Sequence, residues 1–161
     1  MGFIAAVQGS VEVRGSSSRS FEVVLRDRDL EIGDTVRTGP ASAVKILLVD
    51  ETMLTLGEST EVEIESLLTG SPALREPSIL RLLKGAARVV VGEAFGGPTR
   101  LEMHTPTAVV GVKGSSYEAH LIRDPLRGPG LRVYSLGGKV WVQPLDGQGA
   151  VVVIDLPVHH Y

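Results

Sequence analysis

The sequence predicts an all-β fold, a sandwich or jelly-roll-like arrangement of about ten to twelve short strands, with an irregular β-solenoid as the alternative. Hydrophobic residues make up 43% of the 161 residues but aromatic residues only 4%, so the core must be built from Val, Leu, Ile and Ala. The 19 Gly and 9 Pro punctuate the chain, which is typical of short strands and tight turns. The length suits one domain, and we expect residues 1–161 to form a single all-β domain.

The first half of the chain reads as a series of short strands. Residues 3–13 are an apolar run, a glycine and then an alternating segment, and residues 21–25 form a second candidate. Residues 44–49 and 53–56 predict a hairpin around a three-residue connection. In residues 61–65, Val62 and Ile64 alternate with glutamates, so we expect both apolar side chains to face the core. We expect the glutamates to form a solvated face rather than a site for a divalent cation.

The segment 78–88 is ambiguous. Its apolar residues fit helical spacing behind a Ser cap, and a helix here would carry a basic stripe suited to a membrane surface. Gly85 in the middle and the valines from Val89 onward favour two strands joined by a turn. We predict strand–turn–strand, with a short helix as the alternative.

In the second half, residues 105–119 organise the chain. Val109, Val110 and Val112 suit a half-buried strand, while Gly111 and Gly114 indicate a bulge or a close backbone approach. This stretch therefore predicts a strand that bends and continues as a second short strand. Residues 131–134 and 139–142 read as another hairpin, and residues 150–156 as a last apolar strand.

A short pattern occurs three times: an apolar entry, a glycine and an alternating strand. It covers residues 7–13, 83–89 and 135–142, with glycines at 9, 85 and 138. The unequal spacing argues against a regular solenoid array. The repeat supports the strand interpretation of residues 83–89.

Composition excludes several classes of function. The net charge of −3, without clustered Lys and Arg, argues against nucleic-acid binding. The absence of cysteine excludes disulfides, thiolate zinc sites and thiol nucleophiles. No apolar stretch approaches the roughly 18 residues of a membrane-spanning helix. The start lacks a charged leader segment, so for an exported protein we expect the targeting segment to have been removed.

No motif predicts catalysis, and we expect no catalytic, cofactor-binding or metal site. Residues 114–116 lack the Gly-x-Ser-x-Gly elbow of serine hydrolases. Residues 137–139 are followed by valine where a phosphate loop needs Ser or Thr. His104 and His120 lie on separate candidate strands, which could approach one another, but ligand spacing is missing. A small-molecule ligand stays undefined, and carbohydrate binding would require more aromatic residues.

Two blocks of residues carry a family resemblance. Residues 105–114 read Thr-Pro-Thr-Ala-Val-Val-Gly-Val-Lys-Gly, and residues 33–39 read Gly-Asp-Thr-Val-Arg-Thr-Gly. Together they resemble the FecR-type domain, the extracytoplasmic sensor module of iron-dicitrate regulators. Ser115 stands where that family usually has threonine. The resemblance covers roughly residues 7–142.

The resemblance implies a non-enzymatic, extracytoplasmic (periplasmic or cell-surface) module that acts in signal transduction through protein–protein contact. Its motif residues with a partner-binding or structural role are Gly33, Asp34, Arg37, Thr38, Gly39, Thr105, Pro106, Gly111, Lys113 and Gly114.

For Arg37 and Lys113 we expect either a contact with a partner, a bond that locks the two blocks together, or a solvated strand charge. Trp141, the single tryptophan, is either a core anchor or an interface hot spot. The competing function is a self-assembling structural or cell-surface subunit that pairs through strand edges.

Overall fold

The computed structural model describes residues 2–48, 51–66, 78–90, 100–124, 128–145 and 150–155. Within them the chain forms fourteen strands and no helix, so the prediction of an all-β sandwich is confirmed. The strands are β1 (Gly2–Gln8), β2 (Val11–Arg14), β3 (Glu22–Val23), β4 (Asp29–Leu30), β5 (Thr35–Thr38), β6 (Ala43–Leu48), β7 (Met53–Leu56), β8 (Glu61–Ser66), β9 (Ser78–Lys84), β10 (Ala86–Val90), β11 (Arg100–His104), β12 (Ala108–Asp124), β13 (Gly128–Pro144) and β14 (Ala150–Asp155).

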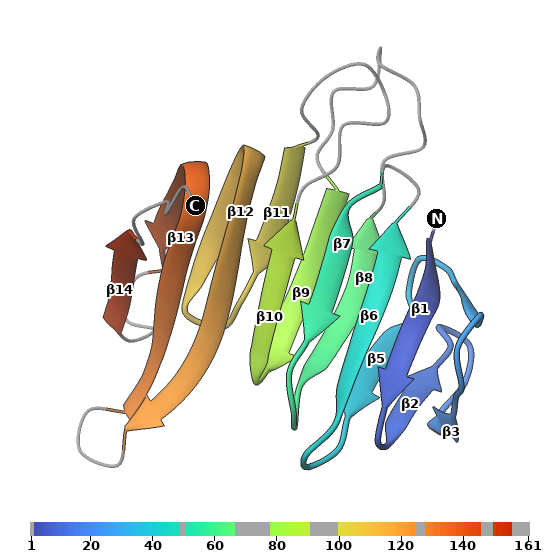
Figure 1. Cartoon of the computed structure of the whole chain (residues 1–161). Helices are drawn as coiled ribbons and strands as arrows, with labels where there is room; N and C mark the ends of the chain where they lie inside the picture. The colour runs from blue at the N-terminus through green and yellow to red at the C-terminus, as the bar shows by residue number, and fades with distance from the viewer. Residues whose placement is uncertain are drawn as a thin grey trace.

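The strands form two layers joined by one continuous hydrogen-bonded ladder (Figure 1). Layer A has the order β3-β2-β5-β8-β9-β11, and layer B the order β4-β1-β6-β7-β10. The long strand β12 belongs to both, because residues 109–113 pair with β11 and residues 116–120 pair with β10. Strand β13 follows β12 through both layers, and β14 adds to β13 in layer B.

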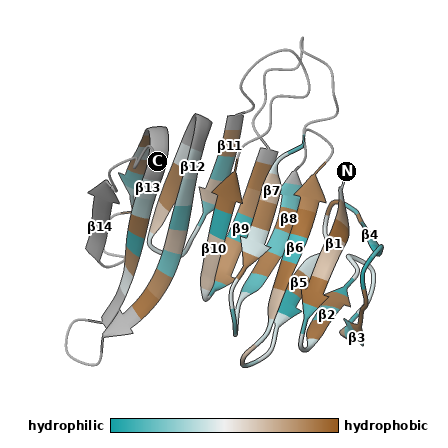
Figure 2. Ribbon diagram, viewed as in Figure 1, coloured by the Kyte–Doolittle hydropathy of each residue, from teal (hydrophilic) through white to brown (hydrophobic). Residues whose placement is uncertain are grey.

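The core lies between the layers and is aliphatic, as the composition predicts. Alternate residues are buried along several strands, for example Ile46 and Leu48 on β6 and Leu54 and Leu56 on β7, so hydrophobic and hydrophilic bands alternate along them (Figure 2). Val62 and Ile64 are buried as expected, with 1% of their surface exposed. The buried hydrophobic residues form one cluster.

Several strand predictions are confirmed. The ambiguous segment is two strands, β9 and β10, separated by Gly85. Strands β6 and β7 form the expected antiparallel hairpin, with its connection closed by a hydrogen bond from Leu48 N to Thr52 O at 2.9 Å. The solenoid alternative is wrong, because the strands stack as two layers.

The predicted hairpin between residues 131–134 and 139–142 is wrong. Both segments belong to the single strand β13, which runs from Gly128 to Pro144 and pairs with β12 throughout. Gly137 and Gly138 suggested a turn, but they lie opposite the register shift of β12 between Lys113 and Ser116. The glycines therefore accompany a bend between layers instead of a chain reversal. The strand count also exceeds the prediction, partly because β3 and β4 have only two residues each.

The glycines of the repeated pattern mark places where the chain passes between layers. Gly9 lies between β1 in layer B and β2 in layer A, and Gly85 lies between β9 in layer A and β10 in layer B. Their φ angles are +78° and +87°, a region that glycine adopts without the steric cost of a side chain. Gly138 lies in the part of β13 that bends with β12.

A side-chain hydroxyl satisfies the backbone at the Gly9 corner. Ser42 Oγ accepts a hydrogen bond from Ser10 N at 2.9 Å and donates one to Pro40 O at 3.0 Å. Gly39 N donates to Ser10 O at 3.0 Å. Both backbone groups of Ser10 are thus paired although the ladder is interrupted there.

The Gly85 corner repeats this arrangement. Thr60 Oγ1 accepts a hydrogen bond from Ala86 N at 3.0 Å and donates one to Glu58 O at 3.0 Å. Gly57 N donates to Ala86 O at 3.0 Å. The second corner is therefore built like the first, from a different part of the chain.

We predict that Gly85→Ala destabilises the fold by about 2 kcal/mol, because alanine resists this positive φ. Its Cβ would also lie 2.6 Å from Thr60 Cα and 2.8 Å from Ser59 O. Gly57→Ala is the matched control, since a Cβ there would lie 3.7 Å from its nearest neighbour, Ala86 O. Urea unfolding measures both variants, and equal stabilities would contradict the proposed role of Gly85.

Tyr117 is the largest fully buried side chain, in the part of β12 that belongs to layer B. Its hydroxyl finds no hydrogen-bond partner within the described part of the chain. Burial raises the pKa of this hydroxyl above its ordinary value of 10.0, because the charged phenolate would lose its hydration. An unpaired buried hydroxyl also costs stability when neutral.

We predict that Tyr117→Phe leaves the free energy of unfolding unchanged or raises it by about 1 kcal/mol at neutral pH, since it removes an unpaired polar group. In the wild type, stability falls as the pH rises above about 10, because the unfolded tyrosine ionises before the folded one. Urea unfolding against pH should show a weaker alkaline loss for Tyr117→Phe than for the control Tyr134→Phe, which changes a half-buried tyrosine. A loss above 1 kcal/mol at neutral pH would reveal a hydroxyl partner.

Candidate functional site

The first motif block begins in a tight turn before β5. Gly33 has a φ of +93°, and its N–H donates to Ile64 O at 2.7 Å. The carboxylate of Asp34, with 7% of the residue exposed, accepts a hydrogen bond from Glu31 N at 2.9 Å. Asp34 O in turn accepts from Ile64 N at 2.9 Å. The Gly-Asp pair thus fixes the entry of β5 against β8.

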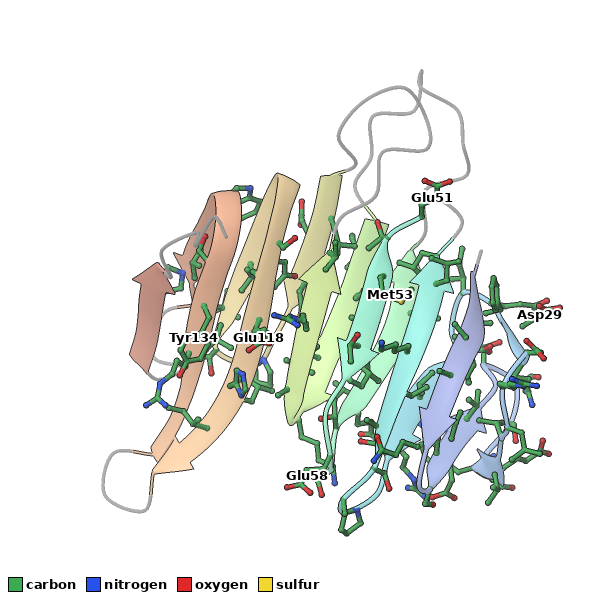
Figure 3. The ribbon with its side chains drawn as sticks, in the orientation of Figure 1. Asp29, Glu51, Met53, Glu58, Glu118 and Tyr134 are labelled. Atoms are coloured by element: carbon green, nitrogen blue, oxygen red, sulfur yellow. The ribbon has the colours of Figure 1, made fainter. Side chains whose placement is uncertain are left out.

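The end of the same block fixes the exit of β5. Thr38 is buried, and its hydroxyl donates to Gly57 O at 2.6 Å and accepts from Thr60 N at 2.9 Å. The carbonyl of Gly39 accepts from Ser59 N at 3.0 Å. Ala41 N also donates to the carboxylate of Glu58 at 2.8 Å, and Glu58 lies in the turn beside the Gly85 corner (Figure 3). Thr38 and Gly39 therefore tie together the turns of both glycine corners.

Arg37 contacts side chains of its own layer. Its Nε and Nη2 lie 3.2 and 3.3 Å from the two carboxylate oxygens of Glu12 on β2. Its guanidinium carbon lies 3.7 Å from the centroid of the Phe21 ring. With 40% of its side chain exposed, such an ion pair contributes less than about 1 kcal/mol, and the ring contact adds a similar amount.

The second motif block begins with the turn between β11 and β12. The buried Thr105 hydroxyl accepts hydrogen bonds from Thr107 N at 3.2 Å and Ala108 N at 2.9 Å, and donates to Ala108 O at 2.8 Å. Pro106 occupies the exposed tip, where a missing N–H costs nothing. Thr107 O accepts from Leu145 N at 2.9 Å, so this turn also anchors the end of β13.

Gly111 leaves room for the indole ring of Trp141. The two residues are paired across β12 and β13, and a Cβ at Gly111 would overlap the indole ring. Trp141 is 44% exposed, so the interpretation of it as a core anchor is wrong. It lies on the outer face of layer A, because Val140 and Val142 on either side pack against the core.

Lys113 and Gly114 lie where β12 leaves layer A. Lys113 is the last residue paired with β11, opposite Arg100, and the register of β12 against β13 shifts between Lys113 and Ser116. Gly114 falls inside this interval. The end of the second block therefore coincides with the bend of β12.

The structure does not bring the two blocks together. Within layer A, β5 and β12 are separated by β8, β9 and β11. Arg37 bonds toward β2, on the side of β5 away from β12. The blocks act at separate points of the same layer.

Comparison with protein-family models gives a match to the family described as FecR protein over residues 34–153. The chain belongs to the FecR family. The match includes both motif blocks apart from Gly33, which immediately precedes it. Comparisons with curated proteins and with solved structures found no match.

The two histidines in the described part of this FecR domain lie on opposite outer surfaces. His104 bonds Glu102 at 3.0 Å on layer A, while His120 bonds Glu118 at 3.4 Å on layer B. Glu118 also forms an ion pair with Arg88 at 3.1 Å, and it lies beside Tyr134 (Figure 3). Within the described residues no group of three metal-ligating side chains forms. Nor is any described helix long and apolar enough to cross a membrane.

A shallow groove of about 390 Å³ lies where β1 meets β4 and β6. Its walls are mainly apolar, with the exposed Asp29 and Glu31 at the rim. The groove is lined by Gly2, Phe3, Asp29, Leu30, Glu31, Leu47 and Leu48. It lacks the converging donors that position a small polar ligand, so it defines no substrate class.

Sequence reasoning missed the open edge of β13. The segment 139–144 pairs with β12 on one side, and among the described strands none pairs with its other side. The false hairpin concealed this edge, because it assigned residues 139–142 a partner in residues 131–134. Pro144 was the available signal, since proline within a sheet is confined to edge strands and strand ends.

We predict that Gly111→Ala displaces Trp141 and lowers stability by about 1–3 kcal/mol, because the new methyl group overlaps the indole. Trp141 is the single tryptophan, so its fluorescence reports the displacement directly. Gly39→Ala is the control, since a Cβ there would lie 3.5 Å from its nearest neighbour, Ser10 Cβ. In a Trp141→Ala background Gly111→Ala should cost much less, and an unchanged cost would contradict this packing.

Proposed function

We propose that this chain is a non-enzymatic, extracytoplasmic sensor module of the FecR family that binds a protein partner through the open edge of β13. Family membership supports a signalling role and a location outside the cytoplasmic membrane. The observation that carries the proposal is the segment 139–144, whose far side pairs with none of the described strands, beside a half-exposed tryptophan. An extended segment of another protein can add to such an edge as a further strand.

The hydrogen bonds around β12 show which backbone groups the edge offers. Leu145 N bonds to Thr107 O, so by alternation Gln143 and Trp141 also direct their backbone groups toward β12. The backbone groups of Val140 and Val142 then point away from β12, toward the open side. A strand that adds here would find a donor and an acceptor on each valine.

Side chains around the edge suit a protein contact. Trp141 and Leu145 are exposed by 44% and 39%. Tryptophan is enriched among residues that dominate interface energies. The motif residues would serve this contact indirectly, because Gly111 seats Trp141 and Thr107 O holds Leu145.

The opposite end of the sandwich is less suited to strand addition. There β3 and β4 close the two layers with two residues each. Very short edge strands are a common protection against unwanted pairing. We therefore assign partner binding to the end formed by β13 and β14.

The test places a photo-crosslinking amino acid at Gln143 and, as a control, at Val23 on β3, which is 73% exposed. We expect a protein adduct in the extracytoplasmic fraction of the native host from position 143 but not from position 23. Val142→Pro should reduce the yield at least tenfold, because it removes an N–H from the open side while sparing those directed at β12. Equal adducts from both positions, or none from position 143, would overturn the proposal.

A further inference from the structure

We propose that the open edge of β13 pairs with the same edge of a second copy, forming a closed dimer with Trp141 on the twofold axis. This inference rests on the proposed function, because it names an occupant of the same edge. It follows from the order of hydrogen-bonding groups along residues 139–144 and from the unequal ends of the sandwich.

The edge is complementary to itself in an antiparallel register centred on Trp141. Val140 and Val142 carry the outward backbone groups, so a twofold axis at Trp141 places Val140 opposite Val142 of the second copy and Val142 opposite its Val140. Both N–H···O bonds of each such pair then form. Beyond these pairs, Pro144 lacks an N–H, so the ladder ends there. This register therefore pairs every outward backbone group of the two valines.

The same register brings the two Trp141 residues directly opposite one another. Trp141 directs its backbone groups toward β12, so the two copies form a non-hydrogen-bonded pair, in which side chains approach most closely. Each indole leans over Gly111 of β12, away from the second copy, so the backbone bonds of the valines rather than a contact between the rings carry the pairing.

Charges in the register are compatible. Position 139, a lysine, falls opposite position 143 of the second copy, a glutamine. No like charges face each other, which would destabilise a cross-strand pair. In layer B, β14 forms the edge at the same end, because it pairs only with β13 among the described strands.

The unequal ends favour a dimer over a fibre. An isologous contact uses one patch on both copies and closes after two. Growth away from the contact would need an open edge at the far end, which carries only the two-residue strands β3 and β4, whereas the edge of β14 lies at the same end as the contact. This distinguishes the inference from a self-assembling structural subunit, which needs a contact that does not close.

The test uses the absence of cysteine from the chain. In Lys139→Cys/Gln143→Cys, each new thiol lies opposite a thiol of the second copy, at the short Cα separation that a disulfide requires. Within one chain the two thiols are about 13 Å apart along the strand, too far to join. We expect most of this variant to form a disulfide-linked dimer under mild oxidation, with Trp141 retained.

Two single variants are the controls. Gln143→Cys should give no dimer, because its thiol faces Lys139 of the second copy, and Val23→Cys should give none because it lies at the opposite end. Sedimentation should show the wild type as a dimer of the 17.1 kDa chain that dissociates on dilution. Val142→Pro should weaken this association at least tenfold.

A monomeric wild type without disulfide in the double variant would overturn the inference. If position 143 still gave adducts with another protein, the proposed function would stand while the dimer failed. Equal crosslinking of Gln143→Cys and the double variant would overturn the register. A disulfide-linked dimer of Val23→Cys, together with species larger than a dimer in sedimentation, would replace the dimer with open-ended assembly.

Discussion

The whole sandwich depends on moving the chain between its two layers without leaving backbone groups unpaired. A strand that changes layer interrupts the ladder, and a buried N–H or C=O without a partner costs free energy. At Gly9 and Gly85 the positive φ makes the change possible, and the hydroxyls of Ser42 and Thr60 replace the missing ladder partners. Thr38 bonds the turn of the Gly85 corner, and Gly39 bonds both Ser10 of the Gly9 corner and Ser59, which explains how the first motif block supports both corners.

Strands β12 and β13 solve the same problem differently, by bending together as a pair. Each remains the hydrogen-bond partner of the other while β12 exchanges β11 for β10. The pair therefore closes both layers at one end and leaves the far side of residues 139–144 without a described partner. Gly111 contributes to this arrangement as well, because its missing side chain leaves room on β12 for the Trp141 ring.

Much of the fold could be predicted from local pattern. Alternation placed Val62 and Ile64 in the core, and the repeated glycines marked the layer changes before their meaning was known. The pairing of β13 could not be predicted, because Gly137 and Gly138 are equally compatible with a turn and with a bend that only the neighbouring β12 decides. The exposure of Trp141 could not be predicted for the same reason, because it depends on the pairing that places Trp141 over Gly111.

Under the two proposals, the edge of β13 would link self-association to sensing. Its outward backbone groups, on Val140 and Val142, can pair with one added strand at a time, so a second copy and a different protein would compete for them. A partner strand then binds only by displacing the second copy. Its apparent affinity for the edge therefore falls as the concentration of the chain rises. Because the opposite edge is shortened to β3 and β4, this competition has two outcomes, dimer or complex, and does not branch into a fibre. The asymmetry between the two ends of the sandwich is what would make such an exchange usable as a signal.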